Sequence, residues 1–286
     1  MASGVPYALL TLVCFGLNDL LFKRAAQHGA ASHQVMMVLT LTMAPFFVAY
    51  GLVTHSVVPA PAALWGSVGG LFAFFGFYNF SRSLQSGAVS VLSPIFRLQF
   101  VVTAGLALAF FGEHLSAVKI GGLFLAIAAV WLLLGNSAGA RVEVPREAIA
   151  RVLLATVAVG IAFFLFKLAL RQGATPATVL LCQVFALSSA STALSIYLDR
   201  SFSASPAALR YGIPFGVSQA IGFGALIEAL AIGEASVLVP IAQLSFILTA
   251  VIGLTFLKEA ATARKMIGLV AAVGAVALLA LAARDV

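Results

Sequence analysis

Long apolar runs with almost no charge follow one another along nearly the whole chain. Each is about as long as the roughly 20 residues that a helix needs to cross the hydrocarbon core of a bilayer. Of the 286 residues, 62% are hydrophobic and only 9% are charged, whereas a soluble domain usually has about 25% charged residues. The runs are continuous, while a membrane β-barrel would show two-residue alternation. The sequence therefore predicts an all-α integral membrane protein.

The interruptions between these runs divide the chain into ten predicted transmembrane helices with short connections. The predicted spans are 4–23, 34–54, 62–81, 88–111, 117–135, 148–168, 176–198, 207–229, 235–257 and 265–283. The first span lacks the basic region and the small-residue cleavage site of a signal peptide, so we interpret it as retained. The net charge of +7 comes from Lys and Arg residues at span ends, where they anchor helices at the membrane interface. We therefore expect no nucleic-acid partner.

One segment occurs twice. VSVLSPIFRLQF at 89–100 returns as ASVLVPIAQLSF at 235–246. The offset 240 − 94 = 146 aligns Pro94 with Pro240, and over the surrounding residues the two copies agree at about half of their positions. A second match, at offset 144, joins LLFKRAAQHGA to FLFKLALRQGA nearer the start of each half.

Each copy holds five predicted spans, and because five is odd the second copy enters the membrane upside down. We therefore predict two inverted five-helix repeats, an architecture that places the substrate site of many secondary transporters near the midplane, where the halves meet. The predicted repeats cover residues 1–136 and 148–286, with a connecting loop at 137–147.

The repeated pattern also suggests a family. YNFSRSLQSGAVSVLSPIF followed by FFGEHLSAVKIGGLFLAIAAVWLL, with its counterpart ALIEALAIGEASVLVPIA followed by TFLKEAATARKMIGLVAAVGAVALL, resembles the drug/metabolite transporter superfamily. More narrowly it resembles the EamA-like ten-helix branch, which includes amino-acid exporters of the YddG type. The resemblance implies a transporter and not an enzyme, located in the bacterial inner (plasma) membrane, with a small-molecule substrate and the lipid bilayer as partners. We expect a working monomer without a cofactor or metal.

The repeated prolines predict helix breaks. Proline inside a helix has no N–H to donate and displaces the carbonyl four residues earlier, so Pro94 would free the carbonyl of Ser90, and Pro240 that of Ser236. Irregular backbone at membrane depth is tolerated chiefly where it faces protein or a watery cavity. These positions are expected to be hinges beside a cavity, although a packing kink without substrate contact fits the same pattern.

Arg97 lies near the middle of the fourth span, where an unpaired cation costs at least about 2.5–3.5 kcal/mol. Helical spacing groups it with Ser93 and Pro94 on one face, and the matching face of the ninth span carries Pro240 and Gln243. Both faces are predicted to line one central cavity. Arg97 is suited to bind a carboxylate or phosphate with two parallel hydrogen bonds, and an internal ion pair with Asp19 or Glu228 is the alternative.

Asp19 stands beside Asn18 in the first span, and Lys23 follows at the i+4 position that favours an ion pair. The second repeat has Phe163 in place of this acid. Asp19 is therefore a candidate for proton coupling, for the ion pair with Lys23, or for simple cavity polarity. The other predicted members of the cavity are Tyr78, Asn79 and Gln219, and the second coupling candidate is Glu228. For each of them, a helix-to-helix hydrogen bond is the alternative role.

Two further features concern the ends and walls of the bundle. Glu113 and Glu259 recur just beyond the fourth and ninth spans, which suggests an interface role such as pairing with a base or capping a helix. The fifth and tenth spans are almost entirely apolar and are expected to be outer walls or packing faces. Most basic residues follow odd-numbered spans, which by the positive-inside rule places both termini outside the cytoplasm. The family resemblance implies the opposite orientation.

The function predicted from these features is a secondary transporter that exports amino acids or similar small metabolites by alternating access around a central cavity. Export of drugs or other metabolites of the same superfamily is the alternative, followed by a non-transporting receptor or scaffold. A membrane enzyme would need clustered acids or a reactive Ser or His arrangement, and the four histidines are isolated in the sequence.

Overall fold

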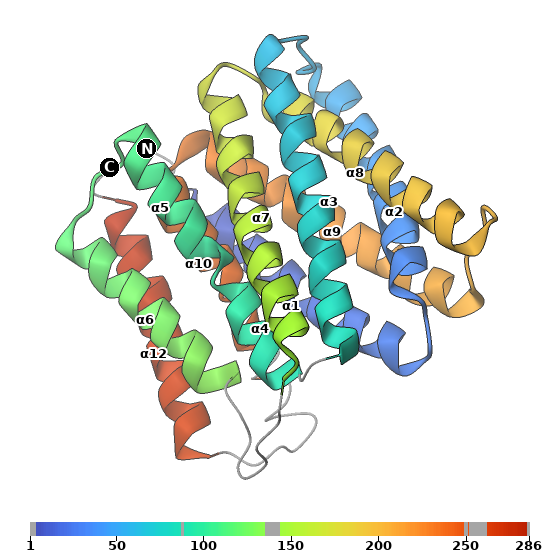
Figure 1. Ribbon diagram of the computed structural model, residues 1–286. Coiled ribbons are helices and arrows are strands. Elements are labelled where there is room, and N and C mark those ends of the chain that lie inside the picture. Colours follow the sequence, from blue (N-terminus) through green and yellow to red (C-terminus); the bar gives the residue numbers. More distant parts are fainter. Residues whose placement is uncertain (1–3, 87–88, 135–143, 249–250, 252–261, 285–286) are drawn as a thin grey trace.

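The computed structural model describes residues 4–86, 89–134, 144–248, 251 and 262–284, which form helices and connections without a strand. Figure 1 shows the helices as a bundle with both chain ends at the same end of the molecule, here called the terminal end. The helices are α1 (Val5–Gln27), α2 (Ser32–Thr54), the short 3-10 helix η1 (Pro61–Ala63), α3 (Leu64–Ser86), α4 (Val89–Arg97), α5 (Gln99–Phe111), α6 (Ala117–Leu134), α7 (Arg146–Arg171), α8 (Pro176–Asp199), α9 (Pro206–Ile232), α10 (Ala235–Gln243) and α12 (Ala263–Ala282).

Seven of the described helices are long and apolar enough to cross a membrane. Three shorter apolar stretches, Ile95–Phe111, Ala117–Leu133 and Ala235–Leu248, fall within the predicted fourth, fifth and ninth spans. The prediction of an all-helical membrane protein is therefore confirmed over the described part of the chain. Helix starts are set by ordinary caps: for example, the Ser205 hydroxyl accepts from the N–H of Ala208 at 3.2 Å, one turn into α9.

Both proline-containing spans are interrupted four residues beyond the proline, at Leu98 and Leu244, and not at the proline itself, and the hinge role of Pro94 and Pro240 remains a prediction. Pro94 lies within α4, although its side chain is outside the described residues, and the interruption comes at Leu98. Pro240 is buried within α10, which ends at Gln243. A proline removes its own hydrogen bond and displaces the carbonyl four residues earlier, and the turn after Pro94 is tightened: Leu98 N donates to Ile95 O at 3.1 Å, three residues back. Such 3-10 geometry is common at helix ends.

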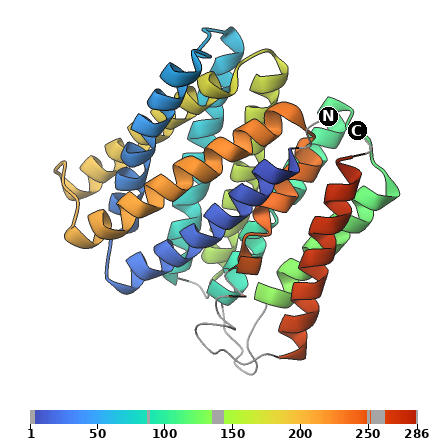
Figure 2. The same cartoon turned by 180° about the vertical axis from the view of Figure 1, so that it is seen from behind.

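The two halves are interleaved, with contacts that occur in matched pairs. The repeat relates α1 to α7, α2 to α8 and α3 to α9. Accordingly α3 packs on α7 and α1 packs on α9, while α2 contacts α9 and α3 contacts α8. Figure 2 shows α1 (blue) and α9 (orange) running side by side on the face opposite to that of Figure 1. The helix pairs that hold the bundle together therefore join one repeat to the other.

Two glycine turns show the same equivalence in the backbone. Gly29 and Gly173, which are 144 residues apart, have φ of 72° and 93°, a conformation that glycine adopts without steric penalty. The following amides bond back to the helix in the same way: Ala30 N donates to Ala25 O and Ala174 N to Ala169 O, each at 3.0 Å. The sequence match at offset 144 thus encodes a shared helix-ending turn.

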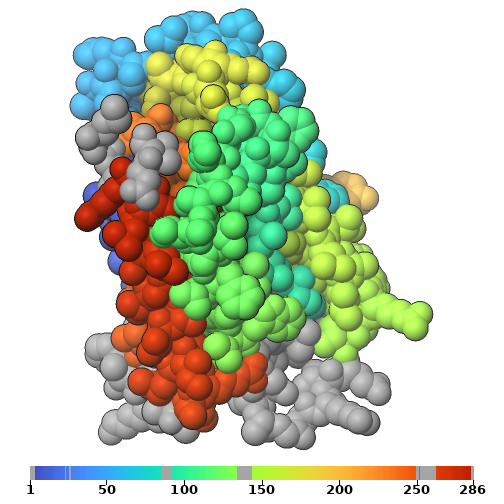
Figure 3. All heavy atoms as spheres, turned by 90° about the vertical axis from the view of Figure 1, so that its left-hand side faces the viewer, coloured from blue at the N-terminus to red at the C-terminus, as the bar shows by residue number. Residues whose placement is uncertain are grey.

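The helices α6 and α12 form an outer wall, as predicted for the fifth and tenth spans. They pack on one another along one side of the molecule (Figure 3). Glycines permit the close approach: a Cβ on Gly122 would stand 2.8 Å from Leu279. The outward side chains are large and apolar, among them Phe124 at 70% and Val270 at 71% exposure, as expected for a surface against lipid.

The fold predicts that alanine substitutions at two glycines have unequal effects on the stability of the protein. A Cβ on Gly160 of α7 would lie 2.8 Å from the carbonyl oxygen of Gln99 and 2.5 Å from Val102 Cβ, whereas one on Gly105 of α5 meets nothing within 4 Å. Both substitutions to alanine gain the same helix propensity. We expect Gly160→Ala to destabilise the protein by about 1–3 kcal/mol through overpacking, and Gly105→Ala to have no such effect, as measured by thermal unfolding in detergent. Equal unfolding midpoints would contradict this packing.

Candidate functional site

Polar side chains connect the two helix interruptions across the middle of the bundle. We call Gln219, Asn18, Asp19, Arg97, Gln99 and Gln243 the polar chain. Its members come from α9, α1, the α4–α5 interruption and the end of α10. Three side-chain contacts and two short backbone steps join them in that order. The polar chain therefore lies where the two repeats meet.

Arg97 forms an ion pair with Asp19. The guanidinium ends α4 and the carboxylate comes from α1, with side-chain exposures of 13% and 34%. Of the open alternatives, the structure shows the internal pair with Asp19, and not one with Glu228. The side chain of Lys23, the other predicted partner of Asp19, is outside the described residues. Each charge compensates the other at a depth where a lone charge is costly.

Two amide contacts flank this ion pair and cross between the halves. Asn18 Nδ2 donates to Gln219 Oε1 at 2.5 Å, and Gln99 Nε2 donates to Gln243 Oε1 at 2.7 Å. Asn18, Gln99 and Gln243 are buried. The remaining oxygens, Asn18 Oδ1 and Gln99 Oε1, are buried and have no hydrogen-bond partner among the described residues. Unsatisfied buried acceptors are uncommon in proteins, so both can receive a hydrogen bond from a bound ligand or water.

The α4–α5 interruption is held from the side by α7. The Thr156 hydroxyl donates to the carbonyl oxygen of Ile95 at 3.1 Å, just before the interruption. Just after it, the Thr103 hydroxyl donates to the carbonyl oxygen of Gly160 at 3.0 Å. Both hydroxyls also bond within their own helices. A helix of the second half thus fixes the position of Arg97, which lies between these two contacts in the chain.

Other predicted site residues do not join the polar chain through a described contact. Asn79 donates to the carbonyl oxygen of Phe75 within its own helix at 2.9 Å, and Tyr78 is half-buried with its ring stacked near Phe74. Ser93 is half-buried in α4. Glu228 accepts a hydrogen bond from the Tyr50 hydroxyl, which joins α9 to α2. The structure thus brings together six polar groups and leaves these four elsewhere.

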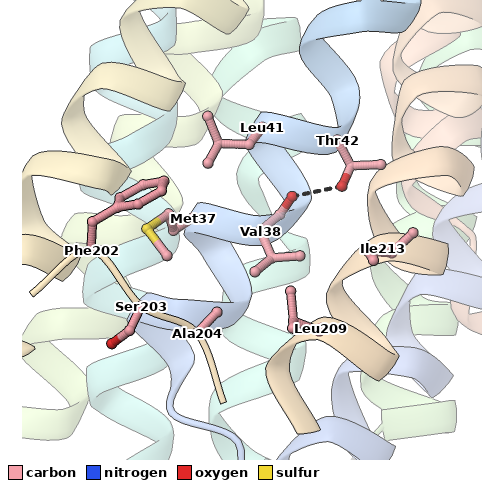
Figure 4. A pocket seen from close by; sticks show the side chains of 9 residues that line it. All are labelled: Met37, Val38, Leu41, Thr42, Phe202, Ser203, Ala204, Leu209 and Ile213. Carbon is pink, nitrogen blue, oxygen red and sulfur yellow. Dashed lines mark hydrogen bonds between the residues drawn. The ribbon is translucent and has the colours of Figure 1, made fainter. Parts of the chain in front are cut away.

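Neither of two hollows lined by described residues includes a predicted cavity residue. One, of about 380 Å³, lies between α2, α9 and the connection at 202–204, and its walls are mostly apolar (Figure 4). In it Thr42 is turned to its own helix, donating to Val38 O at 2.8 Å. The other, of about 330 Å³, lies at the terminal end and is lined by charged residues, including Glu113 and Lys167. The central cavity remains a prediction.

Sequence reasoning missed several contacts around this second hollow. Glu113, expected at an interface, bonds to the first residues of α10, and Lys119 forms an ion pair with Glu234. At offset 146 Glu113 aligns with Glu259 and Lys119 with Lys265, but Glu234 has Ala88 at the matching place in the first half. The glutamine contact was also unexpected, because Gln99 and Gln243 are not equivalent positions in the repeat. Glu259 lies outside the described residues.

Comparisons with known proteins agree with this arrangement. A family model described as the EamA-like transporter family matches twice, over residues 2–135 and 147–281. A solved structure described as "Crystal structure of protein" is similar over 99% of this chain and 98% of its own, with a TM-score of 0.81 and 18% sequence identity. At that identity the likeness shows the shared fold. The comparison with curated proteins gave no match.

The ion pair predicts non-additive stability effects. Asp19→Asn leaves the Arg97 cation unpaired, and Arg97→Gln leaves the carboxylate unpaired, whereas the double variant removes both charges. We expect each single change to lower stability more than the double change does, with a coupling of about 1–2 kcal/mol. A double-mutant cycle of thermal unfolding in detergent measures it. The exposed i,i+4 pair Glu147–Arg151 is the matched control, with a coupling below about 0.5 kcal/mol. Additive losses at Asp19 and Arg97 would refute the pairing.

Proposed function

Because the chain belongs to the EamA-like transporter family, whose model matches both halves, we propose that it is a secondary transporter that exports amino acids or similar small zwitterionic metabolites. Alternating access takes place around a central cavity between the repeats. The observation that carries the choice of substrate is the ion pair between Arg97 and Asp19. The proposed location is the bacterial inner membrane, and the proposed functional unit is the monomer, like the YddG-type exporters that the sequence resembles.

The proposed architecture is ten membrane-crossing helices in two inverted repeats. The seven long helices and three shorter apolar stretches of the described residues, 7 + 3 = 10, support this count. The repeats are residues 1–136 and 148–286, with 137–147 between them. Matched helix contacts and matched glycine turns support their equivalence. An odd number of spans in each repeat supports the inversion.

The ion pair favours a zwitterion over a simple anion. An anion that takes Arg97 from Asp19 leaves the carboxylate of Asp19 unpaired, and an isolated charge at this depth costs about 2.5–3.5 kcal/mol. A substrate with neighbouring carboxylate and ammonium groups replaces both partners, since its carboxylate binds Arg97 and its ammonium group binds Asp19. An α-amino acid has this arrangement of charges.

The flanking amides suit the same substrate. Asn18 directly precedes Asp19 in the chain, and Gln99 lies two residues after Arg97. Each has a buried side-chain oxygen without a described hydrogen-bond donor. An ammonium group has three N–H donors, of which Asp19 would use one. The remaining donors can satisfy these oxygens. Neutral drugs lack both charges and would leave the ion pair intact, so drug export is less suited to this site.

We expect the two charged residues to recognise different substrate groups. Flux of a neutral amino acid into proteoliposomes is compared with flux of its amide, which lacks the carboxylate, and of its deaminated analogue, which lacks the ammonium group. The wild type should prefer the amino acid by at least about tenfold, the effect of 1.4 kcal/mol. Arg97→Gln, which copies the second repeat, should lose the preference over the amide, and Asp19→Asn the preference over the analogue.

Arg151→Gln, at an exposed pair, is the control for this assay and should keep both preferences. If Arg97→Gln folds normally and still discriminates against the amide, Arg97 does not bind the carboxylate. If no amino acid is transported but other metabolites are, the superfamily function stands and the amino-acid assignment fails. Absence of flux for every solute tested would favour a receptor or scaffold.

For proton coupling we propose Glu228. Asp19 already has a cation partner, whereas among the described residues the only hydrogen-bond donor to the Glu228 side chain is the neutral Tyr50 hydroxyl, and no base lies within ion-pair distance. A carboxylate without a cation inside a membrane protein is favoured as a proton carrier. We expect Glu228→Gln to retain substrate flux down its own gradient and to lose the stimulation by a pH gradient.

Tyr50→Phe is the matched control for Glu228, because it removes the hydrogen bond and keeps the carboxylate. It should retain stimulation by the pH gradient, measured in the same proteoliposomes. Stimulation that persists in Glu228→Gln and disappears in Asp19→Asn would assign the coupling to Asp19 instead.

A further inference from the structure

The turn between α9 and α10 at the terminal end is held by a carboxylate of the other half. Glu113, just beyond α5, accepts hydrogen bonds from the backbone N–H groups of Ala235 and Ser236, each at 2.9 Å, and from the Ser236 hydroxyl. These N–H groups have no partner within a helix that begins at Ala235, and a negative charge at a helix N-terminus is favourable. Glu113 therefore caps a helix of the second repeat from the first.

A second ionic contact lies beside this cap. Lys119, near the start of α6, forms an ion pair with Glu234, the residue before α10. Its side chain is only 1% exposed. The N–H of His114 also points to the Glu234 carboxylate, at 3.4 Å. The short segment 113–119 of the first half thus grips the α9–α10 turn through two charged side chains.

Another cation at this turn, Lys167, belongs to the same half as the turn itself. Lys167 of α7 donates to the carbonyl oxygens of Leu230 and Gly233, at 2.6 and 2.7 Å, and so caps the end of α9. The hydrogen bonds of Lys167 lie within the second half, whereas those of Glu113 and Lys119 join the two halves. The charge of Lys167 also lies near Glu113 and Glu234 in the same hollow, so the control is a cation outside that hollow, Arg151 in the exposed pair within α7.

The two broken helices are enclosed to different degrees. All nine residues of α10 are buried, whereas in α4 Ser93, Ile95 and Arg97 are half-buried. In a transporter of two equivalent repeats, alternating access requires that the repeats differ in conformation in any one state. The more enclosed helix, α10, belongs to the second repeat, and Glu113 and Lys119 of the first repeat hold its N-terminus.

We propose that Glu113 and Lys119 form a latch that closes the terminal end of the transport pathway, and that both contacts part when the protein opens to that end. The inference rests on the proposed transport function. The latch holds Glu234, Ala235 and Ser236, while Lys167 keeps the turn intact in both states.

The test measures how fast a reporter thiol, placed between the latch and the centre of the bundle, reacts with an external reagent. In a background with Cys14→Ser and Cys182→Ser, Ser245→Cys places one thiol just beyond the end of α10, at a residue that is fully buried. Proteoliposomes are treated with a membrane-impermeant thiol reagent, and a cleavable C-terminal tag identifies the molecules whose terminal end faces the reagent. Glu113→Gln and Lys119→Met should each raise the labelling rate from that end at least tenfold. Arg151→Gln, at the exposed pair within α7, should change it less than twofold.

Unchanged labelling in Glu113→Gln and Lys119→Met variants with wild-type unfolding midpoints overturns the latch. For variants that do not fold, a second measurement decides. Glu113→Cys and Ser236→Cys, joined through two disulfides by a short bis-thiosulfonate reagent, should make reporter labelling from the terminal end at least tenfold slower than in the untreated protein, with recovery when the disulfides are reduced. Labelling unaffected by complete cross-linking overturns the proposal. Labelling needs no substrate, so a latch without any detectable flux would refute the transport function alone.

Discussion

Enclosure of interrupted backbone inside a membrane is the constraint on which the rest of the structure depends. Hydrocarbon offers no partner to a free carbonyl or amide, so the interruption at Leu98 is possible only where protein supplies the missing hydrogen bonds. The carbonyl of Ile95 receives both the Leu98 amide and the Thr156 hydroxyl. The helix α7 that provides this hydroxyl comes from the other repeat, so the broken helix of the first half depends on the second half for its stability.

The two repeats differ where the chemistry is expected, and they differ in a correlated way. Arg97 has Gln243 as its counterpart, and Asp19 has Phe163, which is buried. The cation and its anion are therefore both present in the first half and both absent from the second. Had only one of them been replaced, the other would be an uncompensated charge in the membrane interior. The ion pair is thus one unit, and it makes a nearly symmetric scaffold asymmetric at its centre.

The sequence predicted the helical membrane fold and the equivalence of the halves, because apolar run length and a repeated motif directly reflect bilayer thickness and duplicated structure. It predicted a special role for Arg97 from the cost of a lone cation, but left its partner open between Asp19 and Glu228, since the distance between α1 and α4 is a tertiary property. Helical spacing could not show that Asn79 would bond to its own backbone. Lys119 and Glu234 are 115 residues apart, and no pattern in the sequence pairs them.

The helices α5 and α10 connect the polar chain to the terminal end. They pack side by side in opposite directions (Figure 1). At one end Gln99 bonds to Gln243, and at the other Glu113 bonds to Ala235 and Ser236. A nine-residue helix is about 13 Å long and is stiff over that length, so a shift at one end moves the other. A substrate that separates Arg97 from Asp19 acts two residues from Gln99. The same pair of helices can therefore carry a change at the ion pair to the contacts that close the terminal end.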